Sequence, residues 1–303
     1  MIQIPTVLIL GAGASAHCAY PLGSQFVSQL SSLRGTSELN NLPDGWTRSN
    51  AEAFLTKLSR SGHYSIDAFL EKNREQAELG KFLIARELKK HEDINLLFPP
   101  HNSGWYQYLF NQLLAPDGSP DFAANQLGIV TFNYDRSLEA YLHTALQARF
   151  DINEDEAAKK LKSIAITHVH GILGKYPEAR YQRETELSEL MNISSQIQII
   201  HEISDQDVGF CNAMFKQAHE MLVKAKRIYF LGFGFHPDNI RRFRFFTPEN
   251  TTGKLILSTL RGLGTRERND LIARLIPAGF KSSDFDSGGY ECNSFFKYSA
   301  SLD

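Results

Sequence analysis

Five short, nearly unbroken apolar runs stand out along the chain. Each is bounded by glycine or polar residues, and several are rich in β-branched side chains. Runs of this length and continuity are typical of strands that are buried on both faces of a parallel sheet. They cover residues 6–10, 128–132, 164–169, 227–231 and 254–258.

Amphipathic helical patterns separate the later runs. They cover residues 136–147, 206–225 and 265–276, so strand and helix alternate over the C-terminal two thirds of the chain. Such alternation is what a parallel sheet with helical crossovers requires. The pattern therefore predicts an α/β protein with a Rossmann-like open parallel sheet.

The stretch between the first two predicted strands follows a different pattern. It shows little strand signal but several amphipathic helix candidates, including residues 65–90 and 104–114. We interpret it as a helical module inserted into the sheet fold. The predicted organisation is a single domain over 1–303, with a Rossmann-like core at 1–23 and 126–303 and a helical insertion at 24–125.

The amino-acid composition argues against several classes of protein function. The 303 residues are 42% hydrophobic and 22% charged, with a formal net charge of -2, which is enough apolar content for a large core. The near-neutral balance gives no bulk attraction to nucleic acid or anionic lipid, so neither partner is expected. No apolar run approaches the roughly 20 residues that cross a bilayer. The first residues, MIQIPTVLIL, lack the features of a signal peptide.

Cysteine is scarce. Cys18, Cys211 and Cys292 stand apart, with no pair at the spacing of a zinc site. A structural zinc ribbon is excluded, no metal is expected, and the reducing cytoplasm is the expected location. We interpret Cys18 and its neighbour His17 as packing residues or as walls of the pocket rather than a nucleophile pair, because adjacent residues on a helix do not face each other.

The first predicted strand ends in a glycine-rich turn, within the sequence TVLILGAGASAH. Gly11, Gly13 and Ala16 fit the dinucleotide fingerprint G-x-G-x-x-A, in which backbone N–H groups hold a phosphate. Two features argue against an ordinary dehydrogenase. Pro21 and Gly23 interrupt the helix that should follow, and no strand ending in Asp or Glu appears about 20 residues further on. The alternative is a tight packing turn without a ligand.

Polar residues and glycines follow three more predicted strands. TFNYD places Asn133 and Asp135 after the second strand, and THVHG places His170 and Gly171 after the third. FLGFGFHPDN ends the fourth strand with two glycines. Because open parallel sheets bind ligands at the carboxyl ends of their strands, we expect these positions to share one site.

In this order, the motifs resemble the Sir2-like (sirtuin-related) family, specifically the NAD-hydrolysing domains of bacterial antiphage defence proteins. The resemblance rests on GAGAS, TFNYD, His170 with Gly171, LGFGF at 231–235 and, less closely, SIDAFL at 65–70. It spans most of the chain and covers the helical insertion least. It implies the Sir2/DHS-like NAD-binding fold, with NAD+ as the substrate.

The resemblance implies a role for each matched position. His170 would be the general base, and Asn133 would lie by the nicotinamide ribose and orient the attacking water or hydroxyl. Asp135 would support this pair, and Asp67 would lie near the nucleotide cleft. The remaining positions would contact NAD+: Gly11, Ala12, Gly13, Ala14 and Ser15 at the pyrophosphate, Gly232, Gly234 and Ser258 at the adenosine half, together with Thr131, Phe132 and Gly171.

These residue types suit cleavage of the nicotinamide glycosidic bond. The leaving pyridinium already carries a positive charge, so it needs no general acid, unlike the leaving group of an ordinary glycoside. A histidine with a near-neutral pKa can take a proton from water or a ribose hydroxyl. An asparagine can fix the nucleophile, since its amide both donates and accepts hydrogen bonds.

Deacylases of the family carry a four-cysteine zinc module that this sequence lacks, which favours NAD+ hydrolysis over deacylation. The expected function is an NAD+ glycohydrolase that releases nicotinamide and ADP-ribose in antiphage defence. Because an unrestrained NADase would kill its own cell, we expect gating by a homo-oligomer or a partner defence protein encoded nearby. The alternatives are an NAD- or ADP-ribose-binding sensor or assembly subunit without turnover, a deacylase or ADP-ribosyl transferase, and a hydride-transfer enzyme.

Several of these residues also have simpler interpretations. His168 faces the same way as His170 in a regular strand, so spacing alone does not separate them. Asn133 also fits a turn residue, Asp135 an N-cap of the following helix, and Asp67 the capped start of a helix.

Overall fold

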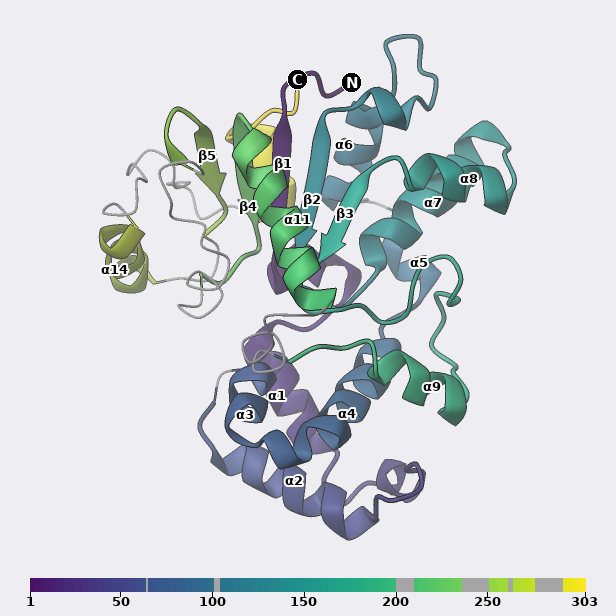
Figure 1. Cartoon of the computed structure of the whole chain (residues 1–303), viewed down its shortest axis with the longest axis vertical. Coiled ribbons are helices and arrows are strands. Elements are labelled where there is room, and N and C mark those ends of the chain that lie inside the picture. The colour runs from purple at the N-terminus through teal and green to yellow at the C-terminus, as the bar shows by residue number, and fades with distance from the viewer. Residues whose placement is uncertain (64, 101–103, 200–209, 236–250, 261–263, 276–290) are drawn as a thin grey trace.

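A five-stranded, all-parallel sheet with helices on both faces forms the centre of the molecule (Figure 1). The structure is a computed structural model. It describes residues 1–63, 65–100, 104–199, 210–235, 251–260, 264–275 and 291–303, and the structural statements below concern these residues. The predicted α/β class with an open parallel sheet is confirmed.

All five predicted strands are present, each within one residue of its predicted ends. They are β1 (Thr6–Leu10), β2 (Leu127–Thr131), β3 (Ala165–His168), β4 (Arg227–Leu231) and β5 (Leu255–Ser258). Their order across the sheet is β3-β2-β1-β4-β5, the order of a doubly wound Rossmann sheet. In such sheets the strand order reverses beside β1, where the crossover from β3 leads to β4. That point is the usual place for a ligand.

The core helices lie on the two faces of the sheet. They are α6 (Gly104–Leu113), α7 (Ser137–Phe150), α8 (Glu154–Leu161), α11 (Phe210–Lys224), α14 (Thr265–Leu275) and α15 (Cys292–Tyr298). They confirm the helices predicted at 136–147 and 265–276 and most of the one at 206–225, of which 206–209 lie outside the described residues.

Alternate residues of β1 point to the two faces and enter two separate hydrophobic clusters. Val7 and Ile9 pack with Leu222 and other residues of α11, which crosses the near face of the sheet in Figure 1. Leu8 and Leu10 belong to the other cluster, which contains residues of α6, α7 and α15. This alternation follows from the two-residue period of a strand, and it explains why residues 7–10 are all apolar.

The helical module lies beyond the carboxyl ends of the strands, toward which the arrows of Figure 1 point. It contains α1 (Gly23–Ser32), α2 (Arg48–Arg60), α3 (Ile66–Lys72), α4 (Ala77–Lys89) and α9 (Leu187–Ser194). Within the module, the short turn η3 (Ser37–Asn40) lies between α1 and α2, and η4 (Arg74–Gln76) lies between α3 and α4. Helix α5 (Ile94–Leu97) follows α4 in the chain and leads to α6, and the turn η5 (Phe122–Ala124) lies between α6 and β2. The module therefore faces the edge of the sheet at which the motifs end.

Two helices do not follow the predicted division of the chain into a Rossmann-like core and a helical insertion. Helix α6, within the predicted insertion 24–125, packs on α7 and α15 beside the sheet. Helix α9, from the later part of the chain, packs on α4 of the helical module. The predicted helical stretch 65–90 is divided into α3 and α4 at Asn73, whose side-chain Nδ2 donates to the Phe69 carbonyl at 2.7 Å.

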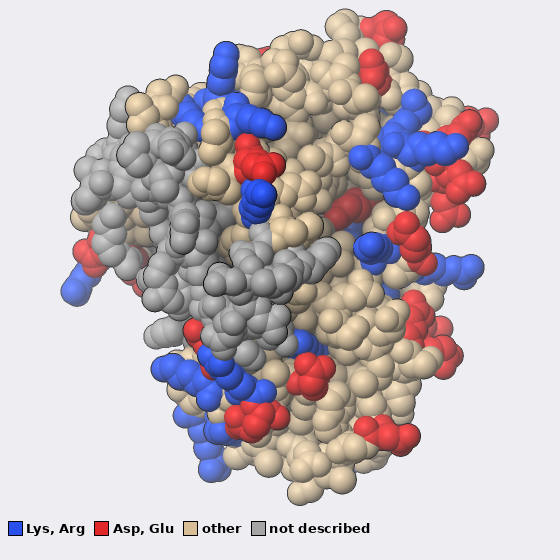
Figure 2. Space-filling view, viewed as in Figure 1, with Lys and Arg blue, Asp and Glu red and all other residues tan. Residues whose placement is uncertain are grey.

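Charge is spread rather than concentrated on the face shown in Figure 2, where Lys and Arg side chains alternate with Asp and Glu. This agrees with the formal net charge of -2. In the described part of the chain, every helix is too short or too polar to cross a membrane.

Candidate functional site

The glycine turn after β1 leads into two 3-10 turns, not directly into an α-helix. These are η1 (Ala12–Ala14) and η2 (Ala16–Cys18), and α1 begins only at Gly23. The helix interruption that the sequence predicts is thus present. Three backbone amides of the turn already donate hydrogen bonds within the protein. The Gly11 amide donates to the Leu231 carbonyl, the Gly13 amide to the Gly232 carbonyl and the Ala14 amide to the Gly11 carbonyl. Fewer amides are left for a phosphate than the sequence pattern implies.

Two glycine turns, one after β1 and one after β4, are pressed together. A Cβ at Gly11 would lie 2.6 Å from the Gly232 carbonyl oxygen, and one at Gly13 would lie 2.7 Å from the Gly232 Cα. Gly232 itself has a φ of +58°, and a Cβ there would lie 2.2 Å from the Ala14 nitrogen. The glycines of the G-x-G pattern are therefore needed for the close packing of the two turns, at the point where the strand order reverses.

Gly232→Ala is expected to lower the free energy of unfolding by more than about 2 kcal/mol, because the new Cβ is strained and collides with backbone. Gly234→Ala is the matched control. A Cβ there meets nothing within 4 Å among the described residues, so a change below about 1 kcal/mol is expected. Urea unfolding of both variants measures the difference, and equal effects would contradict the interlocked turns.

Asn133 and Asp135 meet the glycine turn from β2. The Asn133 Nδ2 donates to the Gly11 carbonyl at 3.0 Å and lies 3.3 Å from the Ser15 Oγ. The Ser15 hydroxyl donates to the Asp135 Oδ2 at 2.8 Å. One chain of hydrogen bonds thus joins the GAGAS and TFNYD motifs, as the sequence predicts for strand ends at one edge.

Asp135 is buried and also contacts the start of helix α7. Its Oδ1 accepts hydrogen bonds from the backbone amide of Ser137, the first residue of α7, and from the Ser137 hydroxyl. The N-cap of α7 is Arg136, so Asp135 lies one residue before the N-cap position rather than at it, and it accepts from the first amide of the helix. Burial raises the pKa of Asp135, and the hydrogen bonds from Ser137 and Ser15 oppose that rise.

The structure separates the two histidines that spacing leaves equivalent. Both ring nitrogens of His168 form hydrogen bonds. Its Nε2 lies 2.7 Å from the Glu139 Oε1, and its Nδ1 lies 3.0 Å from the Asn133 carbonyl oxygen. His170 lies among aromatic rings, with its centroid 5.4 Å from that of Phe132 and 6.2 Å from that of Phe215. His170 therefore contacts the residue next to Asn133, whereas His168 bonds the Asn133 main chain.

Gly171 ties His170 to the following loop. Its φ is +81°, and a Cβ there would lie 2.0 Å from the Gln196 carbonyl oxygen. The Gln198 amide donates to the His170 carbonyl at 2.9 Å. Glycine is required at this position because of both the conformation and the close approach.

Asp67 reaches the same region from the helical module. The Tyr134 hydroxyl donates to the Asp67 Oδ1 at 2.5 Å, and the Ser65 hydroxyl accepts from the Asp67 amide. The capped helix start is confirmed, because Ser65 is the N-cap of α3, and the role of Asp67 near the nucleotide stays a prediction. Thr131, buried at the end of β2, accepts the Asn133 amide with its Oγ1 at 3.1 Å.

On the β4 and β5 side, the side chain that bonds the β4 glycine turn is that of Thr259, not that of Ser258. The Ser258 side chain is fully buried, and its hydroxyl donates to the Thr259 carbonyl at 3.1 Å. The Thr259 Oγ1 instead accepts the Gly232 amide at 2.8 Å. Gly234 is exposed, while Pro237 and Asp238 lie outside the described residues.

Sequence reasoning did not single out Glu139, Thr259 or the polar role of Trp105. The Trp105 ring is buried in the core, and its Nε1 donates to the Ala14 carbonyl at 2.8 Å. A buried glutamate in the otherwise apolar stretch SLEAYL is a signal that could have marked Glu139.

His17 and Cys18 fit the packing role predicted for them. Burial lowers the pKa of His17 to about 4, and burial raises the pKa of the fully buried Cys18 far above its ordinary value. A thiol held protonated in this way is a poor nucleophile.

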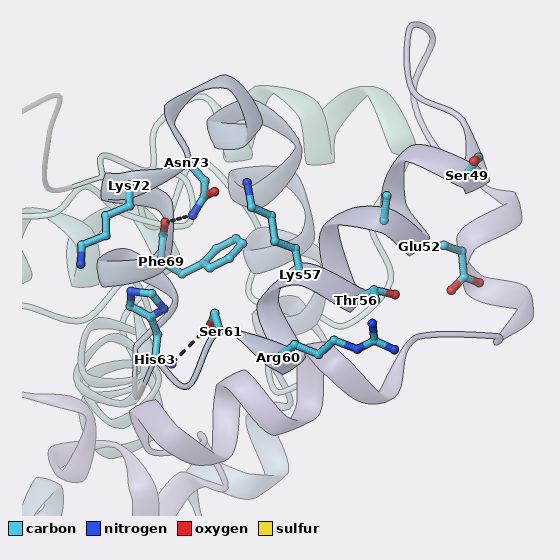
Figure 3. Close-up of a pocket in the computed structure, with 11 residues that line it drawn as sticks. Ser49, Glu52, Thr56, Lys57, Arg60, Ser61, His63, Phe69, Lys72 and Asn73 are labelled. Atoms are coloured by element: carbon cyan, nitrogen blue, oxygen red, sulfur yellow. Dashed lines mark hydrogen bonds between the residues drawn. The ribbon is translucent and has the colours of Figure 1, made fainter.

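Two cavities lie near these elements. One, of about 660 Å³, is lined by His168, Gly171 and residues of α9 and of the loop before it. The other, of about 870 Å³, is a hollow between α2 and α3 that Figure 3 shows, with Lys57, Arg60 and His63 among its lining residues. Phe69 of SIDAFL lines this second cavity, but none of the candidate catalytic or NAD+-binding residues does. Within the described ranges, no three His, Cys, Asp or Glu side chains are grouped to hold a metal ion.

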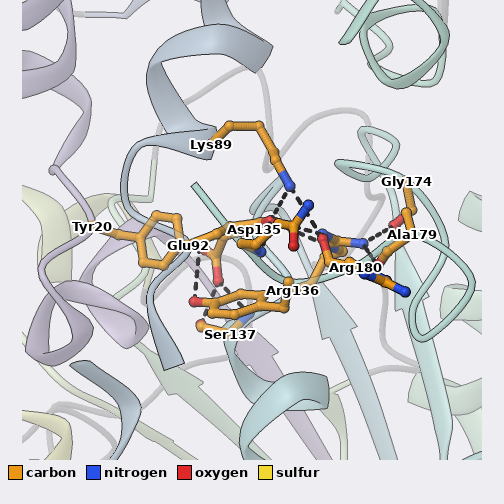
Figure 4. A network of polar contacts seen from close by, with 11 residues as sticks. Tyr20, Lys89, Glu92, Asp135, Arg136, Ser137, Gly174, Ala179 and Arg180 are labelled. Carbon is orange, nitrogen blue, oxygen red and sulfur yellow. Dashed lines mark hydrogen bonds and ion pairs between the residues drawn. The ribbon is translucent and has the colours of Figure 1, made fainter. Parts of the chain in front are cut away.

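A buried ionic network lies directly behind the motif (Figure 4). Arg136, the residue after Asp135, makes two hydrogen bonds to Glu92, at 2.9 and 2.8 Å, and Lys89 pairs with the same carboxylate. All three side chains are at most 2% exposed. Arg136 also donates to the carbonyls of Gly174, Ala179 and Arg180. The network holds the helical module, β2 and the loop after β3 together.

The chain was compared with models of protein families and with curated proteins, and it matches none of them.

Proposed function

We propose that the protein is an NAD+ glycohydrolase that releases nicotinamide and ADP-ribose. The observation that carries the proposal is the convergence of three polar residues with the glycine turn. Asn133, Ser15 and Asp135 form one hydrogen-bonded chain at the point where the strand order reverses. Nucleotide ligands of doubly wound sheets bind at this point.

In this proposal Asn133 fixes the nucleophile. Its Nδ2 is held by the Gly11 carbonyl and Ser15, so the direction of the amide is set. No described residue bonds its Oδ1, which can then accept a hydrogen bond from water or from a ribose hydroxyl of NAD+. Asp135 supports this arrangement through Ser15.

His170 is the proposed general base. It lies against Phe132, beside Asn133 in the chain, and would accept the proton of the nucleophile as the glycosidic bond breaks. The nicotinamide leaves as a neutral group because it is bound as a pyridinium, so no general acid is needed. Gly11 to Ser15 are proposed at the pyrophosphate, and Gly232 and Gly234 at the adenosine half. The Ser258 side chain is fully buried and bonds the Thr259 carbonyl, so it is not proposed as a contact of NAD+.

The proposal includes control of the activity. We expect low basal hydrolysis that is relieved by assembly of a homo-oligomer or by a partner defence protein, in the cytoplasm during antiphage defence. Activity per molecule that rises with protein concentration, together with a larger species in size-exclusion chromatography, is the expected result. Activity independent of concentration and of co-expressed neighbouring proteins would contradict this control.

Incubation of the purified chain with NAD+ tests the reaction class. Chromatography should show nicotinamide and ADP-ribose appearing in equal amounts. Saturable binding by calorimetry without either product would instead support a sensor or assembly subunit. An acylated peptide should be unchanged in mass after incubation with NAD+ and protein, and a loss of the acyl group would support deacylation.

A further inference from the structure

We infer that His168 is a positioning residue, positively charged in the folded protein, that holds the main chain of Asn133 in place for the reaction. The inference rests on the proposed function, in which Asn133 orients the nucleophile.

The hydrogen-bond partners of His168 require two ring protons. Its Nδ1 lies 3.0 Å from the Asn133 carbonyl oxygen, which can only accept a hydrogen bond. Its Nε2 lies 2.7 Å from the Glu139 carboxylate, which is also an acceptor when ionised. Only the imidazolium form donates from both nitrogens, so this geometry beside an ionised Glu139 selects the charged ring.

The surroundings favour the same form. The His168 and Glu139 side chains are 8% and 11% exposed, so little solvent screens the pair. Burial by itself lowers the pKa of His168, but the Glu139 charge, the two hydrogen bonds and the Asp135 charge together raise it. The charged groups that line the adjoining cavity are Lys175, Glu178 and Glu189.

Loss of a proton from the His168 ring would change the position of Asn133. A neutral His168 keeps the proton on the nitrogen that faces the stronger acceptor, the Glu139 carboxylate. The other nitrogen, Nδ1, would then have no proton to donate, and the Asn133 carbonyl would lose its bond. The Asn133 side chain is bonded to Gly11 and Ser15, so release of its main chain would misplace the amide that orients the nucleophile.

The charge state can be measured without activity. In protein labelled with ¹⁵N-histidine, NMR spectra at pH 7 should show both ring nitrogens of His168 protonated. Assignment uses the signal that disappears in a His168→Leu, Glu139→Leu double variant, in which an apolar pair replaces the ionic pair and folding is retained. Glu139→Gln should move the His168 midpoint to lower pH, whereas Glu156→Gln on the exposed start of α8 should not. One unprotonated ring nitrogen at pH 7 in the wild type would overturn the inference.

Two measurements test whether His168 positions the main chain of Asn133. The backbone amide signal of Tyr134, which shares a peptide group with the Asn133 carbonyl, should titrate with the same midpoint as His168. The double variant should lose about 10-fold or more in kcat with little change in KM, because misplacing a positioning group lowers the rate rather than binding. A folded double variant with the wild-type kcat would overturn the positioning role. If the wild type cleaves no NAD+, the proposed function fails, and the Tyr134 titration still decides whether His168 holds Asn133.

Stability should follow the same titration. Because the folded-state pKa of His168 is raised, the pair stabilises the fold fully below the unfolded value of about 6.5. The contribution is lost as the pH rises through the folded value. The wild type should therefore lose more of its urea midpoint between neutral and alkaline pH than the double variant, and parallel curves would contradict the charged pair.

Discussion

His170→Ala is expected to lower the rate of nicotinamide release by about 10²- to 10⁴-fold, the usual contribution of a general base. The side chain is 5% exposed and lies between Phe132 and Phe215. Its removal takes away the proposed proton acceptor and leaves the hydrogen-bonded chain of Asn133, Ser15 and Asp135 in place. NAD+ binding, measured by calorimetry, should therefore change much less than the rate.

A histidine variant elsewhere serves as the control for this experiment. His63 lines the hollow between α2 and α3 (Figure 3) and takes no part in the proposed chemistry, so His63→Ala should retain the wild-type rate. If His170→Ala kept most of the activity while its fold and NAD+ affinity were unchanged, another group would have to be the base.

Glu92→Ala is expected to lower the free energy of unfolding by about 3–5 kcal/mol. The substitution leaves Arg136 and Lys89 buried without the carboxylate that both contact. Burial already lowers the pKa of Lys89, and Glu92 partly opposes this, so Lys89 should lose its proton more readily in the variant. The carbonyl contacts of Arg136 with the loop at 174–180 (Figure 4) would also loosen.

An exposed glutamate gives the matched comparison. Glu75 is 68% exposed and lies 3.6 Å from Lys57, and removal of such a surface partner costs about 0–1 kcal/mol. Chemical denaturation of Glu92→Ala and Glu75→Ala measures both. A loss below about 1 kcal/mol for Glu92→Ala would mean that the network is hydrated and does not hold the modules together.

The sheet could be predicted from the sequence because its strands carry the information locally. Residues 7–10 are apolar at every position because successive side chains such as Val7 and Leu8 face opposite clusters, and both clusters are buried. The placement of α6 and α9 could not be predicted in the same way. Each is amphipathic, and an apolar face indicates that a helix is buried without indicating against which neighbour.

The candidate site was predictable in outline and not in its contacts. Strand ends at one edge of a parallel sheet explain why Asn133 meets the glycine turn. The pairing of His168 with Glu139 joins residues 29 positions apart on different elements, and no sequence pattern reports it. Ser258 and Thr259 differ by one position, and which of them faces Gly232 depends on how the strand ends.

The glycines illustrate a further limit. G-x-G after a strand indicates that the backbone must come close to something, and the pattern is the same for a phosphate and for a second turn. In the structure the close neighbour of Gly11 and Gly13 is Gly232. The phosphate role of the turn thus remains part of the proposal, and it rests on the groups around the turn.

The most direct test of the central claim is product release from NAD+ by the wild type and by Asn133→Ala, each at low and high protein concentration. The account predicts equal amounts of nicotinamide and ADP-ribose from the wild type. It predicts a loss of both products in Asn133→Ala, which should still fold and bind NAD+. Binding of NAD+ by the wild type without either product, at every concentration and with co-expressed neighbouring proteins, would contradict it.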